Sequence, residues 1–68
     1  MTSDQYRAAI ETLGLSQVAA AKLLGVDPRT SRRWASGERD VPAPAERFLR
    51  YLIATGKTGE KAMRVLLD

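Results

Sequence analysis

Residues 16–37 of the chain read SQVAAAKLLGVDPRTSRRWASG and contain the boundary signals of two short helices in succession. Ser16 can cap the first helix, because its hydroxyl can accept a hydrogen bond from a backbone N–H that the first turn leaves free. Gly25 suits the left-handed conformation that commonly ends a helix. Together these signals predict a helix over Gln17–Leu24.

The second helix has an equally clear start. Asp27 is a favourable N-cap, and Pro28 suits the first helical position, where its missing N–H is not needed. Gly37 ends this helix, which is predicted over Pro28–Ser36. Two helices joined by so short a glycine-containing turn are typical of a helix-turn-helix unit, placed here at about residues 16–36.

The predicted helix over Pro28–Ser36 has two different faces. At 100° per residue, three arginines and a serine fall within one arc of about 100°: Arg29, Arg32, Arg33 and Ser36. Trp34 and Ser31 fall on the opposite side, which predicts that they face the core. The arginines repel one another by about a few tenths of a kcal/mol per i,i+4 pair, so an anion outside the chain is expected to offset this repulsion.

Double-stranded DNA is the anion that suits this face best. An α-helix enters the major groove, and arginine reads O6 and N7 of guanine with two parallel hydrogen bonds. The charge distribution points the same way. Residues 28–39 carry four arginines and one glutamate, whereas the rest of the chain has seven charges of each sign, so the net charge of +3 lies in this window. The alternative is a solvated helix that only keeps the protein soluble.

Helical signals also precede this unit. Thr2 and Gln5 form the pattern of a capping box, which predicts a helix that runs to about residue 13. Its apolar stripe, at i, i+4 and i+7, consists of Tyr6, Ile10 and Leu13.

Two further helices are predicted after the helix-turn-helix. Pro44 can begin one over residues 44–55, and Thr58 can cap another over residues 59–67. The first of these has an apolar stripe made of Ala45, Phe48, Leu49, Leu52 and Ile53. Because β-branched residues are few and alanine, leucine and arginine are many, the chain is predicted to be all-α, a compact five-helix domain over residues 1–68.

The composition excludes most kinds of catalytic site. The chain has no cysteine and no histidine, which removes disulfides, thiolate zinc sites, cysteine nucleophiles and Ser-His-Asp arrangements. Its carboxylates are scattered, with no pair suited to acid–base catalysis. We therefore expect no enzyme activity, no catalytic or metal-binding residue, no cofactor and no small-molecule substrate. No apolar run approaches the roughly 20 residues that span a bilayer, and no signal peptide is evident, so a cytoplasmic location without a membrane partner is expected.

Residues 15–39 resemble the helix-turn-helix of the Cro/phage-repressor (Xre-like) family. The shared residues, in chain order, are Ser16-Gln17, Ala21, Leu24-Gly25-Val26, Arg33-Trp34 and Ser36-Gly37. This resemblance implies a lambda-repressor-like DNA-binding fold. It also implies a transcriptional regulator, a repressor, that binds a two-fold operator in double-stranded DNA as a homodimer and is nucleoid-associated when bound.

The resemblance further implies roles for individual residues. The residues that match base-contacting positions are Arg29, Arg33 and Pro28, the last through an apolar contact only. The residues that match backbone-contacting positions are Ser16, Gln17, Thr30, Arg32, Ser36 and Arg39. A phosphate at the start of the helix that begins at Gln17 is physically reasonable, because free N–H groups and the helix dipole favour an anion there.

Two positions depart from what family members usually carry. Ala20 stands where a larger aliphatic residue is usual, and Ser31 stands where valine or isoleucine is usual. A buried Ser31 hydroxyl needs a hydrogen-bond partner, and the expected one is a carbonyl one turn back. Tyr6 and Tyr51 are expected to be half-buried, with their hydroxyls reaching water.

A protein-interaction module of the same fold is the alternative function. Such a module, an antitoxin or a phage accessory factor, would have weak or no DNA binding. A salt titration separates the two, because a protein that neutralises several phosphates loses DNA affinity steeply as salt rises.

Overall fold

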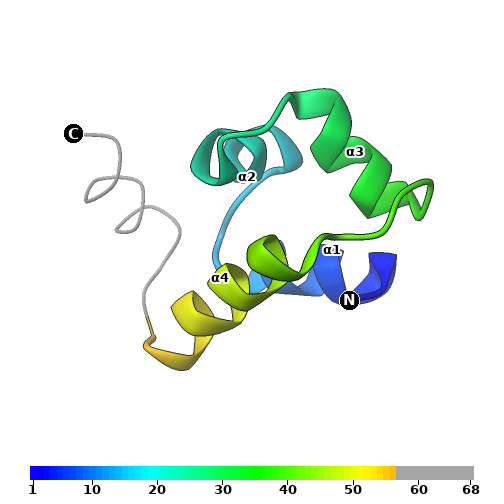
Figure 1. Ribbon diagram of the computed structural model, residues 1–68. Coiled ribbons are helices and arrows are strands. Elements are labelled where there is room, and N and C mark those ends of the chain that lie inside the picture. Colours follow the sequence, from blue (N-terminus) through cyan, green and yellow to red (C-terminus); the bar gives the residue numbers. More distant parts are fainter. Residues whose placement is uncertain (57–68) are drawn as a thin grey trace.

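The computed structural model describes residues 1–56, which form four α-helices and no strand (Figure 1). The helices are α1 (Ser3–Thr12), α2 (Gln17–Leu24), α3 (Pro28–Ser36) and α4 (Ala43–Ala54). The predicted all-α class is confirmed for these residues, and none of their helices is long and apolar enough to cross a membrane. The helix predicted over residues 59–67 lies outside the described residues.

Local hydrogen bonds fix the starts of the first three helices. Thr2 Oγ1 accepts from the Gln5 N–H at 3.1 Å while Gln5 Oε1 accepts from the Thr2 N–H at 2.9 Å, which is the predicted capping box. Ser16 Oγ accepts at 3.0 Å from the N–H three residues on. Asp27 Oδ1 accepts from the Arg29 N–H at 2.8 Å. The predicted bounds of α2 and α3 are therefore confirmed to the residue.

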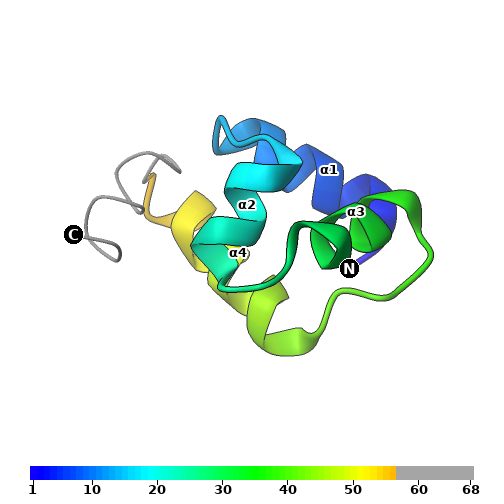
Figure 2. The same cartoon turned by 90° about the horizontal axis from the view of Figure 1, so that it is seen from above.

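Helices α2 and α3 lie above the other pair of helices. In Figures 1 and 2, α2 and α3 lie next to each other over α1 and α4. The main packing contacts are α2 with α3, α1 with α3 and α1 with α4. Gly25, at φ +71°, turns the chain sharply between α2 and α3 in a conformation that L side chains rarely adopt. This arrangement leaves one long side of α3 uncovered at the edge of the described part.

A single apolar core lies between the four helices. Its buried members are Tyr6, Ile10, Leu13, Ala20, Leu23, Trp34, Ala35, Val41, Leu49 and Leu52. The predicted stripe of α1 is confirmed. On α2, Leu23 is buried, whereas Leu24 is only partly buried; both line a surface groove with Phe48. On α4, Ile53 was predicted to be buried but is 37% exposed, near the open end of the α1–α4 packing.

Tyr6 and Ser31 form a buried hydroxyl pair between α1 and α3. Their oxygens are 2.6 Å apart, and neither side chain has exposed surface. Burial raises the pKa of Tyr6, although the hydrogen bond with Ser31 opposes that rise. Two expectations are thus wrong: the partner of Ser31 is not a carbonyl one turn back, and the Tyr6 hydroxyl does not reach water. The cause is that α1 packs directly on the inner face of α3, which brings the phenol to the small serine.

The pair predicts a specific pattern of stability losses. Tyr6→Phe or Ser31→Ala alone is expected to lower the free energy of unfolding by about 1–3 kcal/mol, because each leaves a buried hydroxyl without a partner. The double variant should lose less than the sum of the two, since it removes both polar groups. Chemical denaturation measures all three, with the exposed Tyr51→Phe as the control. Additive losses would show that the hydroxyls do not interact.

Candidate nucleic-acid interface

The outer face of α3 carries a row of cationic and polar side chains. The exposed residues on this face are Arg29, Arg32, Arg33 and Ser36. The opposite face is buried, with Ser31 fully covered and Trp34 and Ala35 each 4% exposed. The ring of Trp34 packs edge-on against Tyr6, with centroids 5.7 Å apart and planes at 84°. The two-faced character predicted for this helix is therefore confirmed, and the tryptophan belongs to the core.

The arginines on this face have no partner among the residues that the structure describes. Within residues 1–56, Arg29, Arg32, Arg33 and Arg39 form no ion pair and donate no side-chain hydrogen bond. The ion pairs found in that span lie elsewhere: the Met1 amino group with Glu46 at 2.5 Å, Arg7 with Asp4, and Arg50 with Glu46 at 3.5 Å. The guanidinium donors of α3 are thus available to a ligand.

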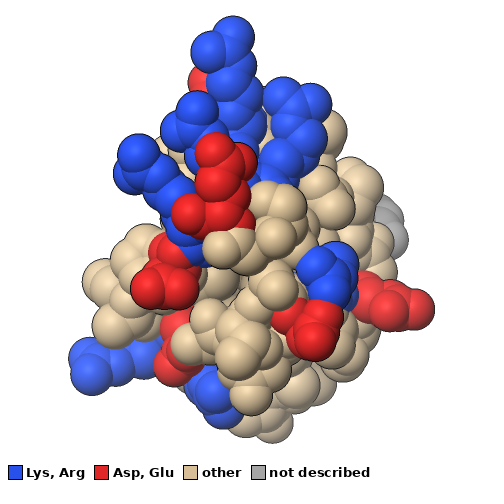
Figure 3. Space-filling view, turned by 90° about the vertical axis from the view of Figure 1, so that its right-hand side faces the viewer, with Lys and Arg blue, Asp and Glu red and all other residues tan. Residues whose placement is uncertain are grey.

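The charges around α3 gather at one end of the molecule. Figure 3 shows Lys and Arg side chains concentrated over the part where α3 lies, with acidic side chains between them and further down the face. A shallow hollow there is lined by Arg29, Arg32, Arg33, Ser36 and Glu38. Glu38 and Asp40 follow α3 in an exposed loop, so the surface is basic along the helix and mixed just beyond it.

A side chain from outside the helix forms a hydrogen bond at each end of α3. Asp27 caps its first turn, as described above. At the other end, Arg7 Nη1 donates to the carbonyl of Ala35, and Nη2 of the same guanidinium pairs with Asp4. A cation at the C-terminal end of a helix also interacts favourably with the helix dipole. The sequence carries a signal for the Asp4–Arg7 pair in its i,i+3 spacing but none for the contact with Ala35.

The start of α2 presents polar groups of a second kind. Ser16 Oγ accepts the capping hydrogen bond, and its own hydroxyl hydrogen remains free to donate. Gln17 is the first residue of the helix and is partly buried. Because the first N–H groups of a helix have no partner within it, this end can receive an anion.

Only one of the other predicted site residues lines the hollow beside α3. Pro28 and Arg39 are exposed, and Thr30 is partly buried at the flank of α3; none of them lines the hollow. Ser36 lines it, but its hydroxyl donates to the Arg33 carbonyl at 3.2 Å and accepts from the Glu38 N–H at 3.4 Å. The structure therefore brings together Arg29, Arg32, Arg33 and Ser36, while Ser16 and Gln17 lie on a separate helix.

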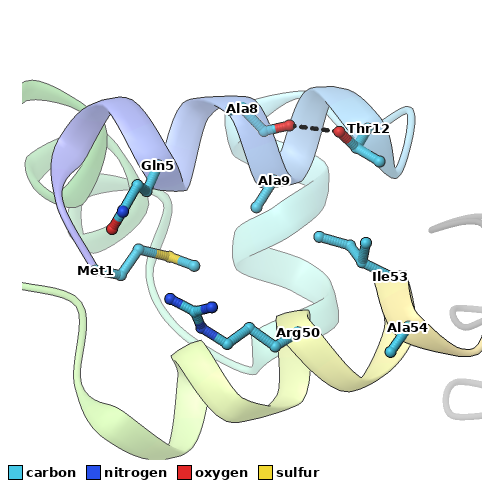
Figure 4. Close-up of a pocket in the computed structure, with 8 residues that line it drawn as sticks. All are labelled: Met1, Gln5, Ala8, Ala9, Thr12, Arg50, Ile53 and Ala54. Carbon is cyan, nitrogen blue, oxygen red and sulfur yellow. Dashed lines mark hydrogen bonds between the residues drawn. The ribbon is translucent and has the colours of Figure 1, made fainter.

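A second hollow lies between α1 and α4 and has a different character. Figure 4 shows Arg50 and Ile53 of α4 pointing toward Met1 and Ala9 across it, while Thr12 donates to the carbonyl of Ala8 at 2.9 Å. The side chains that line it are mostly small or apolar. Among residues 1–56 no group of three or more His, Cys, Asp or Glu residues could hold a metal ion.

Comparison of the chain with protein-family models, with curated proteins and with solved structures found no match.

Proposed function

We propose that this chain is a sequence-specific double-stranded-DNA-binding transcriptional regulator, a repressor, which reads the major groove with α3. The observation that carries the proposal is the row of exposed arginines, without an ion pair in residues 1–56, on a helix that follows a tight glycine turn. A helix-turn-helix places its second helix in the major groove and its first across the backbone. The proposal includes membership of the Xre-like family and its lambda-repressor-like five-helix fold, on the residues quoted above.

The proposed contacts fall into two groups. Arg29 in the first turn of α3 and Arg33 one helical turn further on read base edges, and Pro28 adds an apolar contact. The backbone is held by Ser16, Gln17, Thr30, Arg32, Ser36 and Arg39. Backbone contacts position the protein, whereas base contacts give it sequence preference. Ser36 can take part only if it gives up a bond to its own helix.

The protein acts as a homodimer in this proposal. One helix-turn-helix buries little surface, and dimers of such units bind half-sites about 34 Å apart along the duplex. A two-fold operator follows from the two-fold symmetry of the dimer.

The salt dependence of duplex binding tests the function. The full chain is expected to bind duplex DNA at low salt, with the logarithm of affinity falling linearly against the logarithm of salt concentration. Arg32→Ala should lower affinity for all duplexes and reduce the slope by about 1, because it removes one phosphate contact. Duplex affinity that is absent at low salt, or insensitive to salt, would contradict the proposal.

A protein-interaction module is the second candidate. It is favoured by the exposed apolar residues Val18 and Tyr51, which are 59% and 56% accessible. If the full chain shows no affinity for duplex DNA at low salt, that result would support the protein-interaction function.

A further inference from the structure

The outer face of α3 offers DNA only one kind of long polar side chain. Arg29, Arg32 and Arg33 are exposed along it, and the only other exposed side chains of the helix are those of Pro28 and Ser36. No asparagine or glutamine occurs in α3, and none occurs in the loop of residues 37–42 that follows it. The hydrogen-bonding groups that can reach deep into a groove from this helix are therefore all guanidinium groups.

The rest of the chain does not supply the missing amide. Its sequence contains no asparagine and two glutamines, Gln5 and Gln17. Gln5 lies on α1, where its side-chain oxygen accepts the capping-box bond from Thr2. Gln17 begins α2, the helix that crosses the DNA backbone in this motif.

This composition restricts the bases that α3 can identify. Adenine is recognised in the major groove by the bidentate amide of asparagine or glutamine, whereas arginine pairs its two parallel donors with O6 and N7 of guanine. With arginines and no amide, α3 can identify guanine and has no equivalent group for adenine.

The spacing of the arginines sets the spacing of the bases. Arg29 and Arg33 lie one turn apart on the same side of α3, so their Cα atoms are separated by a rise of about 6 Å along the helix. Base pairs stack at about 3.4 Å, and two steps therefore cover nearly the same distance. Arg32 projects to one side of this pair, toward the wall of the groove.

Resting on the proposed function, we infer that each half-site carries two guanines about two base pairs apart. Arg29 reads one guanine and Arg33 reads the other, each through O6 and N7. Arg32 contacts the backbone and identifies no base. At the other positions of the half-site, α3 gives no direct preference for adenine, because it has no asparagine or glutamine.

Selection of duplexes from a random pool by the full chain, followed by base-analogue substitution, tests this inference. Each of the two guanines is replaced in turn by 7-deazaguanine, which lacks the N7 acceptor, or by inosine, which keeps O6 and N7 but lacks the minor-groove amino group. Each 7-deazaguanine is expected to weaken binding by about 10- to 150-fold, the worth of one hydrogen bond to a charged group. Inosine at the same positions should weaken it far less.

Three variants assign each guanine to its arginine. Arg29→Ala should abolish the 7-deazaguanine penalty at one guanine, and Arg33→Ala should abolish it at the other. Arg32→Ala, on the same helix and also exposed, should lower affinity for every duplex and leave both penalties in place.

The outcomes separate this inference from the proposed function. Salt-dependent duplex binding in which 7-deazaguanine is tolerated at every position, or selected half-sites without guanine, overturns the inference and leaves the function standing. If the 7-deazaguanine penalty at one and the same guanine persists in both Arg29→Ala and Arg33→Ala, the inference is also overturned. Absence of any duplex affinity at low salt overturns both.

Discussion

Replacing Trp34 with alanine is expected to lower the free energy of unfolding by about 3–5 kcal/mol, the loss typical of a large aromatic side chain removed from a core. Trp34 is 4% exposed and packs edge-on against Tyr6. It is also the largest side chain that α3 contributes to the core. Because native proteins have only about 0.05–0.15 kcal/mol of stability per residue, a chain of 68 residues has about 3–10 kcal/mol in total, and this single change should remove a large part of it.

Chemical denaturation followed by circular dichroism measures this loss without relying on tryptophan fluorescence. Trp34→Phe is the control, since it keeps an aromatic ring in the same place and should lose much less stability. A loss below about 1 kcal/mol for Trp34→Ala would match an exposed site rather than a buried one. The side of α3 that faces the core would then be wrongly assigned.

Replacing both Arg29 and Arg33 with alanine is expected to abolish most of the preference for a specific duplex. Each arginine should contribute about 1–3 kcal/mol to specific binding, and the two together about 2–6 kcal/mol if they act independently. Neither side chain makes a bond within residues 1–56, so the folded state should not be destabilised. Removing two like charges one turn apart should even stabilise it slightly, by about a few tenths of a kcal/mol.

The readouts for this pair are the affinity for a selected duplex, the affinity for an unrelated duplex and the unfolding midpoint. Gln17→Ala should weaken binding to both duplexes alike, because a phosphate contact carries no sequence information. Arg50→Ala, which removes a cation beside the hollow between α1 and α4, should leave both affinities within about twofold. Unchanged specific binding in the double variant would remove Arg29 and Arg33 from the interface.

The bounds of the helices were predictable because the chemistry that sets them is local. Ser16 and Asp27 cap their helices through N–H groups two or three residues away, and Gly25 and Gly37 end them through their own backbone freedom. The outward face of α3 was predictable for a similar reason, since nine residues of a regular helix fix which side chains share a side.

The contacts between distant residues were not predictable in the same way. Tyr6 and Ser31 are 25 positions apart, and Arg7 and Ala35 are 28 apart, so no spacing rule links them. Leu23 is buried while Leu24 is only partly buried, a difference that depends on how the other helices pack on α2 and that periodicity within α2 does not contain. What the sequence offered was only the requirement that a buried Ser31 hydroxyl find a partner.

The central claim is that α3 presents its arginine face to duplex DNA, and a backbone amide chemical-shift titration of the full chain tests it most directly. Adding duplex DNA at low salt is predicted to shift the amides of residues 29–36 and those at the start of α2, while those lining the hollow between α1 and α4 stay nearly unchanged. Shifts confined to α1 and α4, with α3 unaffected, would contradict the account.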